Sequence, residues 1–172
     1  MVVATQNPIE MEGTYPLPEA QRDRFMTRIT MGYPSRDSEL EMLERHGAHN
    51  PLDELDPVTH GERITELIDV VGSVYVADVV KDYLVNIVAA TRSHDAVRLG
   101  ASPRASLHLI RTARAKAALA GRDYVIPDDV QAMAIPVLAH RLLPSTRAQL
   151  DGISPVDIVS QILTSTPVPE QA

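Results

Sequence analysis

Three side chains in this 172-residue sequence have types and positions suited to acting on an anion: Asn7, Arg24 and Arg104. Arg104 lies in the stretch "GASPRAS", where a Ser-Pro pair begins a predicted helix. Four other predicted helices carry acids in their first turns, which suits the partial positive charge there, but this one carries none. Two interpretations are open: Arg104 and the exposed backbone N–H groups bind an anion together, or Arg104 turns to a surface carboxylate such as Asp95.

The other two candidates also have two interpretations each. Arg24 lies in "PLPEAQRDRF", at the C-terminal end of a short predicted helix, where a cation suits the helix dipole. Arg24 is therefore either a capping residue or an arginine, anchored by Phe25, that reaches an anion outside its own chain. Asn7 follows the apolar run in "VVATQNP". It is either a turn former or a ligand contact at the end of a strand, where open α/β sheets bind ligands.

The N-terminal third, which positions Asn7 and Arg24, has the pattern of α/β structure. We expect strands at residues 2–4 and 26–33 and helices at 18–25 and 35–46, the second with Leu40 and Leu43 facing inward. Two parallel-type strands cannot form a stable sheet alone, because such sheets need several neighbours and cover on both faces. This third of the sequence is therefore predicted to be a remnant of a larger sheet.

The rest of the sequence, which positions Arg104, is predicted to be helical. Apolar residues at helical spacing indicate helices at 59–71, 77–91, 102–120, 127–142 and 154–163. The residues expected to face the core in the first, second and fourth of these are Ile64, Leu67, Ile68 and Val71, then Val80, Leu84, Ile87 and Val88, then Val130, Met133, Ala134, Val137 and Leu138.

Composition excludes several classes of function. The sequence has no cysteine, so disulfides and thiolate metal sites are excluded, and it has no apolar run long enough to span a membrane. A basic cluster on and just after the third helix of this series, Arg111, Arg114, Lys116 and Arg122, leaves nucleic-acid binding open as an interpretation. The net charge of −7 and the lack of interleaved aromatic residues weigh against it. We expect a cytoplasmic protein that binds neither nucleic acid nor membrane.

Taken in order, "ATQNP", "EGTYPLPEAQRDRF", "GASPRAS", "GRDYVIPDDV" and "LAHRL" resemble the C-terminal portion of a MoxR-type AAA+ ATPase, from residue 2 to about residue 143. The resemblance implies that Asn7 is the sensor-1 residue, that Arg24 is the arginine finger and that Arg104 is the sensor-2 residue. It also implies ATP and Mg²⁺ as cofactors and a homo-oligomeric ring, expected to be a hexamer. Proteins with a von Willebrand factor A-type domain are implied partners in chaperone-like remodelling. The sequence departs from the family pattern at Arg22, where a leucine is expected.

The resemblance also defines the expected fold class, which is mainly α. Residues 1–50 would be the C-terminal remnant of a P-loop α/β AAA+ core with about two strands. Residues 51–165 would be an all-α lid domain, and residues 166–172 a tail.

The sequence lacks the family's nucleotide-binding half. No glycine is followed by lysine, so the phosphate-binding loop G-x-x-x-x-G-K-[ST] is absent. We therefore expect a fragment of a ring ATPase that supplies sensor and finger residues but neither binds ATP tightly nor hydrolyses it alone. The alternative is a non-enzymatic helical interaction module that regulates a full-length ring ATPase.

Overall fold

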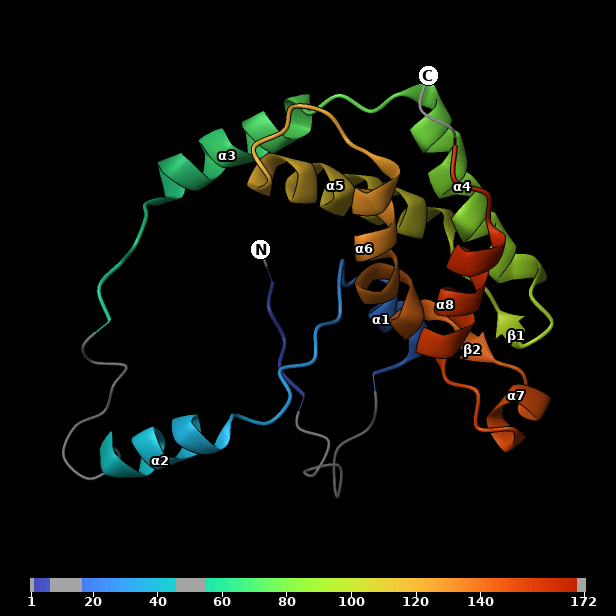
Figure 1. The fold of residues 1–172 in the computed structure, drawn as a ribbon, viewed down its shortest axis with the longest axis horizontal. Coiled ribbons are helices and arrows are strands. Elements are labelled where there is room, and N and C mark those ends of the chain that lie inside the picture. Colours follow the sequence, from blue (N-terminus) through green and yellow to red (C-terminus); the bar gives the residue numbers. More distant parts are fainter. Residues whose placement is uncertain (1, 7–16, 46–54, 170–172) are drawn as a thin grey trace.

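The computed structural model describes residues 2–6, 17–45 and 55–169. Figure 1 shows a mostly helical chain with one small sheet. In chain order the elements are α1 (Glu19–Arg22), α2 (Arg36–Arg45), α3 (Gly61–Ser73), α4 (Asp78–Ser93), β1 (Val97–Leu99), α5 (Pro103–Leu119), α6 (Pro127–Leu138), the 3-10 helix η3 (Ala139–Arg141), β2 (Leu143–Pro144), α7 (Thr146–Leu150) and α8 (Pro155–Ser165).

Four helices, α4, α5, α6 and α8, form the body of the fold and enclose its core (Figure 1). Their buried faces have the predicted helical spacing, and the inward residues predicted for α4 are confirmed. Small side chains let α5 and α6 approach closely, because Ala105, Ala113 and Ala134 are fully buried between larger neighbours. The mainly helical fold class is thus confirmed.

The helix predicted over 127–142 ends earlier than expected. Helix α6 stops at Leu138, and the chain then makes the single 3-10 turn η3 before it becomes extended at Leu142. Pro144 follows, and the residues before a proline are disfavoured in a helix. This early end leaves the carbonyl of Pro136 free to accept a hydrogen bond from outside the helix, from the backbone N–H of Arg28 at 2.9 Å.

The strands do not lie where the sequence analysis placed them. Residues 2–6 and 26–33 form no strand, because no neighbouring strand in the described residues pairs with them. The sheet instead joins β1 and β2 antiparallel within the helical part, so this part is not purely α. A strand needs its neighbours to form, and for these two segments the described residues do not supply them.

Two predicted inward faces are also wrong. Leu40 and Leu43 of α2 are 44% and 69% exposed, and α3 contains no buried residue, although Ile64 and Leu67 were expected to face the core. In Figure 1, α2 lies apart from the helical body, and only the C-terminal end of α3 approaches α5. Helical spacing identifies an apolar face, but it does not show that another surface covers that face.

One glycine is required where the chain enters α5. A Cβ at Gly100 would lie 2.6 Å from the Thr91 carbonyl oxygen and 2.7 Å from Arg92 Cα, both backbone atoms of α4. The same crossing is held by hydrogen bonds to Ala101, whose N–H donates to Thr91 Oγ1 and whose carbonyl accepts from Arg92 Nε. The start of α5, and with it Arg104, is therefore fixed against the end of α4.

Gly100→Ala should therefore destabilise the protein by about 1–3 kcal/mol, because the backbone has to move to make room for the new methyl group. Urea unfolding followed by far-UV circular dichroism measures this change. The control is Gly72→Ala in α3, where nothing lies within 4 Å of the added Cβ. This control should be neutral or stabilising by up to about 1 kcal/mol. Equal effects of the two substitutions would contradict the close approach at Gly100.

No helix within residues 2–6, 17–45 and 55–169 combines the length and the apolar character that crossing a bilayer requires.

Candidate functional site

The segment that follows α1 is attached to the helical body through its backbone. His140 Nε2 donates to the Phe25 carbonyl at 3.2 Å, and Arg141 Nη2 donates to the same oxygen at 2.5 Å. With the bond from Arg28 to Pro136, these contacts hold residues 23–28 against the end of α6 and against η3. Arg24 belongs to this attached segment, so the position of its backbone is set by the helical body.

The carboxylate of Asp23 lies at the centre of the contact between α1 and the helical body. It accepts from Ser102 Oγ at 3.0 and 3.1 Å, from Arg104 Nη1 at 3.3 Å and from Arg141 Nε at 3.1 Å. We call these four residues the Asp23 cluster. The carboxylate supplies, from another part of the chain, the negative charge that the first turn of α5 lacks.

The side chains of Ser102 and Arg104 bond to a different partner from the one expected, namely Asp23. Ser102 occupies the N-cap position of α5, but its hydroxyl donates to Asp23 and makes no capping hydrogen bond. Arg104 does turn to a carboxylate, but that carboxylate is Asp23 and not Asp95. The Arg104 side chain remains 47% exposed and makes one ion pair, so its other N–H groups are available to an incoming anion.

Arg141 is the residue that sequence reasoning missed. Its side chain is only 1% exposed, yet its donors all reach acceptors. Besides the Asp23 carboxylate, these acceptors are the carbonyl oxygens of Asp23, Phe25, Met26 and Val137 and the Nδ1 atom of His108. The available signal was a charged residue in the otherwise apolar run around "LAHRL", since charged residues are seldom fully buried unless paired.

The two histidines beside Arg141 are held neutral. His108 Nδ1 accepts from Arg141 Nη2 at 2.6 Å; burial and then the charge of Arg141 lower the pKa of His108 below its usual range. Burial, followed by the charge of Arg141, lowers the pKa of His140 to about 4, against the opposing effect of the Phe25 and Pro136 carbonyls. Neutral rings leave Asp23 as the anion that neutralises Arg141.

The three predicted site residues have different outcomes. Arg24 is exposed, and its side chain makes no hydrogen bond or ion pair with the described residues. Arg24 directly follows Asp23, the residue that pairs with Arg104, so the backbone of Arg24 lies beside the contact between α1 and the start of α5, which we call the junction. Asn7 lies outside the described residues. Arg22, the departure from the family pattern, pairs with Glu19 at 3.7 Å on the partly exposed side of α1.

The chemistry of this junction fits phosphate better than a metal ion. Within the described ranges there is no group of three or more carboxylate or imidazole side chains that could hold a metal. The half-exposed guanidinium of Arg104 is instead suited to an anion such as phosphate, because guanidinium donates in the planar geometry that phosphate oxygens accept.

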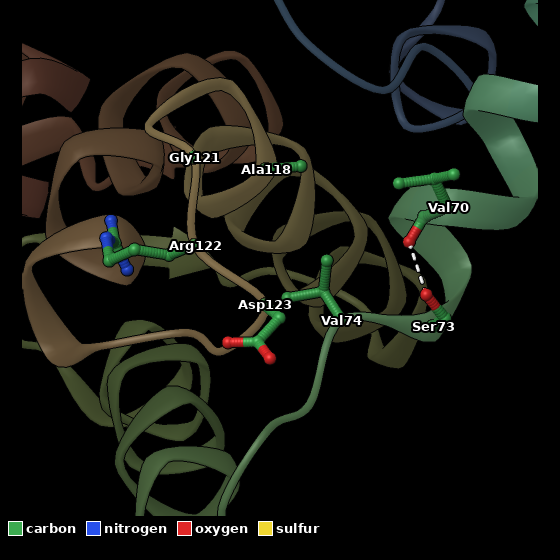
Figure 2. A pocket seen from close by; sticks show the side chains of 7 residues that line it. All are labelled: Val70, Ser73, Val74, Ala118, Gly121, Arg122 and Asp123. Atoms are coloured by element: carbon green, nitrogen blue, oxygen red, sulfur yellow. Dashed lines mark hydrogen bonds between the residues drawn. The ribbon is translucent and has the colours of Figure 1, made fainter.

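A shallow pocket lies elsewhere, between the end of α3 and the loop after α5 (Figure 2). It is lined by Val70, Ser73, Val74, Ala118, Gly121, Arg122 and Asp123. Arg104 and Ala118 are fourteen residues apart in α5, so the pocket is about 20 Å along the helix from the junction. It is therefore separate from the Asp23 cluster.

The basic cluster considered for nucleic-acid binding is partly used inside the fold. Arg122 donates twice to the Asp129 carboxylate, at 2.6 and 2.8 Å, and in Figure 2 its guanidinium points away from Val70 and Ser73. Burial raises the pKa of Asp129, but the hydrogen bonds from Arg122 and from the Ile126 N–H outweigh it, and the net pKa is lowered. Arg122 is thus a structural partner of Asp129.

Two family models match this chain. The AAA lid domain matches residues 89–162, and the ATPase family associated with various cellular activities (AAA) matches residues 1–27. The first match covers the body of the fold around Arg104, and the second ends just after Arg24. The two matches therefore meet at the junction described above.

Known relatives align with almost the whole chain. YeaC from Bacillus subtilis is 46% identical over 99% of this chain and 53% of its own length. Chaperone MoxR1 from Mycobacterium tuberculosis is 41% identical over 99% of this chain and 47% of its own length. MoxR from Paracoccus denitrificans is 30% identical over 98% of this chain and 56% of its own length. The chain thus spans about half the length of the curated relatives it matches.

A solved structure has the same fold. The crystal structure of a Cytophaga hutchinsonii protein assigned to the ATPases superposes with a TM-score of 0.87 at 34% identity, over 96% of this chain and 53% of that one. The helical body and the two family matches relate the chain to one class of protein, the AAA+ ATPases, whose lid domain it contains. More narrowly, the chain belongs to the MoxR family of AAA+ ATPases and corresponds to its C-terminal portion.

Proposed function

We propose that this chain supplies the sensor and finger residues of a MoxR-type ring ATPase. Arg24 acts as the arginine finger, Arg104 as the sensor-2 residue and Asn7 as the sensor-1 residue. The observation that supports this most is the placement of two exposed arginines on one junction, with Asp23 next to Arg24 in sequence and paired with Arg104. AAA+ ATPases as a class use nucleotide with Mg²⁺ and form oligomeric rings.

The chemistry needs what these residues can provide. Phosphoryl transfer depends almost entirely on positioning and on stabilising negative charge in the transition state. Arg104 can exchange the Asp23 carboxylate for a phosphate oxygen, because it makes only one ion pair there and remains half exposed. Arg24 extends from a segment that the lid holds in place, so its guanidinium can act on a phosphate bound by a neighbouring subunit.

The wider context of the activity is also a proposal. We propose a homo-oligomeric ring, a hexamer, that remodels proteins in the cytoplasm together with partners carrying a von Willebrand factor A-type domain. One relative is named a chaperone, which supports remodelling as the general activity. In this proposal residues 1–50 belong to the ATPase core, residues 51–165 are the lid and residues 166–172 are a tail.

A chimera tests the proposed function, with residues 1–172 replacing the matching half of YeaC. The chimera should hydrolyse ATP, and the 172-residue chain alone should not. In the chimera, Arg104→Ala should weaken nucleotide binding by about tenfold to a hundredfold, the loss expected when a charge-assisted hydrogen bond is removed. Binding is measured by titration with a fluorescent ATP analogue.

The matched control is Arg111→Ala, which removes an exposed arginine from the same helix without touching the Asp23 cluster. It should leave nucleotide affinity unchanged. An active chimera in which Arg104→Ala binds nucleotide as tightly as the parent would refute the sensor-2 role.

A second candidate function also has structural support. In it, this chain is a non-enzymatic module that regulates an intact ring ATPase. The exposed apolar side chains of α3, among them Ile64, Leu67 and Ile68, are what a docking helix would present. If this function is correct, adding the 172-residue chain to intact YeaC should change its ATP turnover in proportion to the amount added. No change at a large excess would exclude regulation of that ring.

A further inference from the structure

We propose that Asp23 is a positioning residue that fixes Arg24 and Arg104 relative to each other, with Arg141 as its buried anchor. This inference rests on the proposed function, because it concerns how the two arginines are held. It gives a structural role to the Asp23 carboxylate and to the buried Arg141 guanidinium, neither of which contacts phosphate in the proposed function.

The Asp23 carboxylate joins parts of the chain that are distant in sequence. Its Oδ1 atom accepts from Arg141 and Ser102, 118 and 79 residues away, and its Oδ2 atom accepts from Arg104, 81 residues away. One planar group thus connects α1, the start of α5 and η3. Because Arg24 is the next residue, any rotation of α1 that moved Arg24 would break these bonds.

The two arginines on this carboxylate differ in how firmly they are held. Arg141 is 1% exposed and donates to carbonyl oxygens of three residues on the α1 side, Asp23, Phe25 and Met26. The Arg104 side chain is 47% exposed, and within the described residues its one hydrogen bond is the bond to Asp23, at 3.3 Å. The Arg104 side chain can therefore leave Asp23 for another anion while Arg141 keeps α1 in place and Ser102, bonded to the same carboxylate, keeps the start of α5 beside it.

Loss of the Asp23 charge should loosen this arrangement. A buried cation is tolerated when it is paired, and removing its partner leaves an uncompensated charge. The neighbouring histidines are neutral and cannot replace the carboxylate. The expected result is a less ordered junction. Arg24 and Arg104 are both still present, but their positions relative to each other are no longer fixed.

The first experiment measures the junction directly in the 172-residue chain, which contains a single phenylalanine. That residue, Phe25, accepts hydrogen bonds from His140 and Arg141, so a fluorinated phenylalanine reports the junction by fluorine NMR. Asp23→Asn should shift or broaden the signal toward that of the chain unfolded in urea. The matched control Glu19→Gln removes an acid from the same helix. Among the described residues the Glu19 side chain pairs with Arg22 and with no other cation, so the control should leave the signal unchanged.

A milder variant covers the case in which Asp23→Asn prevents folding, which circular dichroism would show. Ser102→Ala removes one hydroxyl donor to Asp23 and leaves both ion pairs in place, so it should shift the signal in the same direction by less. The proposal is overturned if a folded Asp23→Asn chain keeps the wild-type signal, or if Ser102→Ala and Glu19→Gln behave alike.

The second experiment separates positioning from binding in the YeaC chimera. Asp23→Asn should lower kcat by about tenfold to a hundredfold, the loss expected when reacting groups are misplaced by about an ångström. KM for ATP should change by less than about threefold, because Arg104 is still present. Glu19→Gln should change neither.

These results distinguish the two proposals. If Arg24→Ala and Arg104→Ala leave the chimera fully active, the proposed function is wrong, whatever the fluorine signal shows. If those substitutions impair the chimera while Asp23→Asn leaves kcat unchanged, the positioning role of Asp23 is wrong and the proposed function stands.

Discussion

Arg24→Ala in the YeaC chimera should lower ATP turnover about a thousandfold or more and leave ATP affinity within about threefold of the parent. An arginine finger contributes to the transition state, in which negative charge moves onto the transferring group, and contributes little to ground-state binding. The exposed Arg24 side chain makes no hydrogen bond or ion pair within the described residues, so its removal breaks no polar interaction there. Steady-state kinetics and an equilibrium nucleotide titration measure the two quantities separately.

Arg28→Ala is the matched control for this experiment. Arg28 is an exposed arginine in the same attached segment, and the bond that attaches it comes from its backbone, which alanine retains. The control should keep turnover within about twofold of the parent, as expected for a surface substitution. Joint loss of affinity and turnover in Arg24→Ala would show that Arg24 is structural, and unchanged turnover would exclude the finger role.

The helices of the body were predictable because the sequence itself contains both surfaces of each contact. The inward face of α4, with Val80, Leu84, Ile87 and Val88, is buried by α5, α6 and α8, all of which the chain supplies. The prediction that the apolar faces of α2 and α3 are buried, made from the same spacing, was wrong because the described residues do not cover those faces. The strands expected at 2–4 and 26–33 failed for a related reason, because a strand requires a hydrogen-bonding neighbour.

The site was predictable only in part. Arg24 and Arg104 stand out by type and by their place in short motifs, and these are local properties. The carboxylate that joins them and the arginine that anchors it are separated from each other by 118 residues. No local pattern contains that pairing, so Asp23 and Arg141 were recognised only in three dimensions. Asn7 lies outside the described residues and stays a prediction.

The same junction makes the stability of the protein depend on pH through His140. Its ring is 8% exposed, and Nε2 donates to the Phe25 carbonyl. The other nitrogen, Nδ1, is buried and makes no hydrogen bond with the described residues. Burial and the adjacent Arg141 lower the pKa of His140 from 6.5 to about 4.

The sign of the effect follows from that pKa. Between about pH 6.5 and about pH 4 the unfolded chain binds a proton at His140 and the folded protein does not, so stability falls as the pH falls. A pKa lowered from 6.5 to about 4 corresponds to a loss of up to about 3 kcal/mol over this interval. His108 acts in the same direction, because burial also lowers its pKa. Asp129, whose pKa is lowered from 3.8, contributes only below this interval.

His140→Gln should therefore flatten the dependence of stability on pH. The glutamine amide can still donate to the Phe25 carbonyl but does not titrate, so the remaining slope should be that of His108. Urea unfolding by circular dichroism at several pH values between about 7 and about 4 gives the slope directly. His60→Gln, at an exposed position before α3, is the control and should keep the wild-type slope. If His140→Gln keeps the wild-type slope as well, His140 binds its proton as readily in the folded protein as in the unfolded chain, and burial beside Arg141 does not lower its pKa.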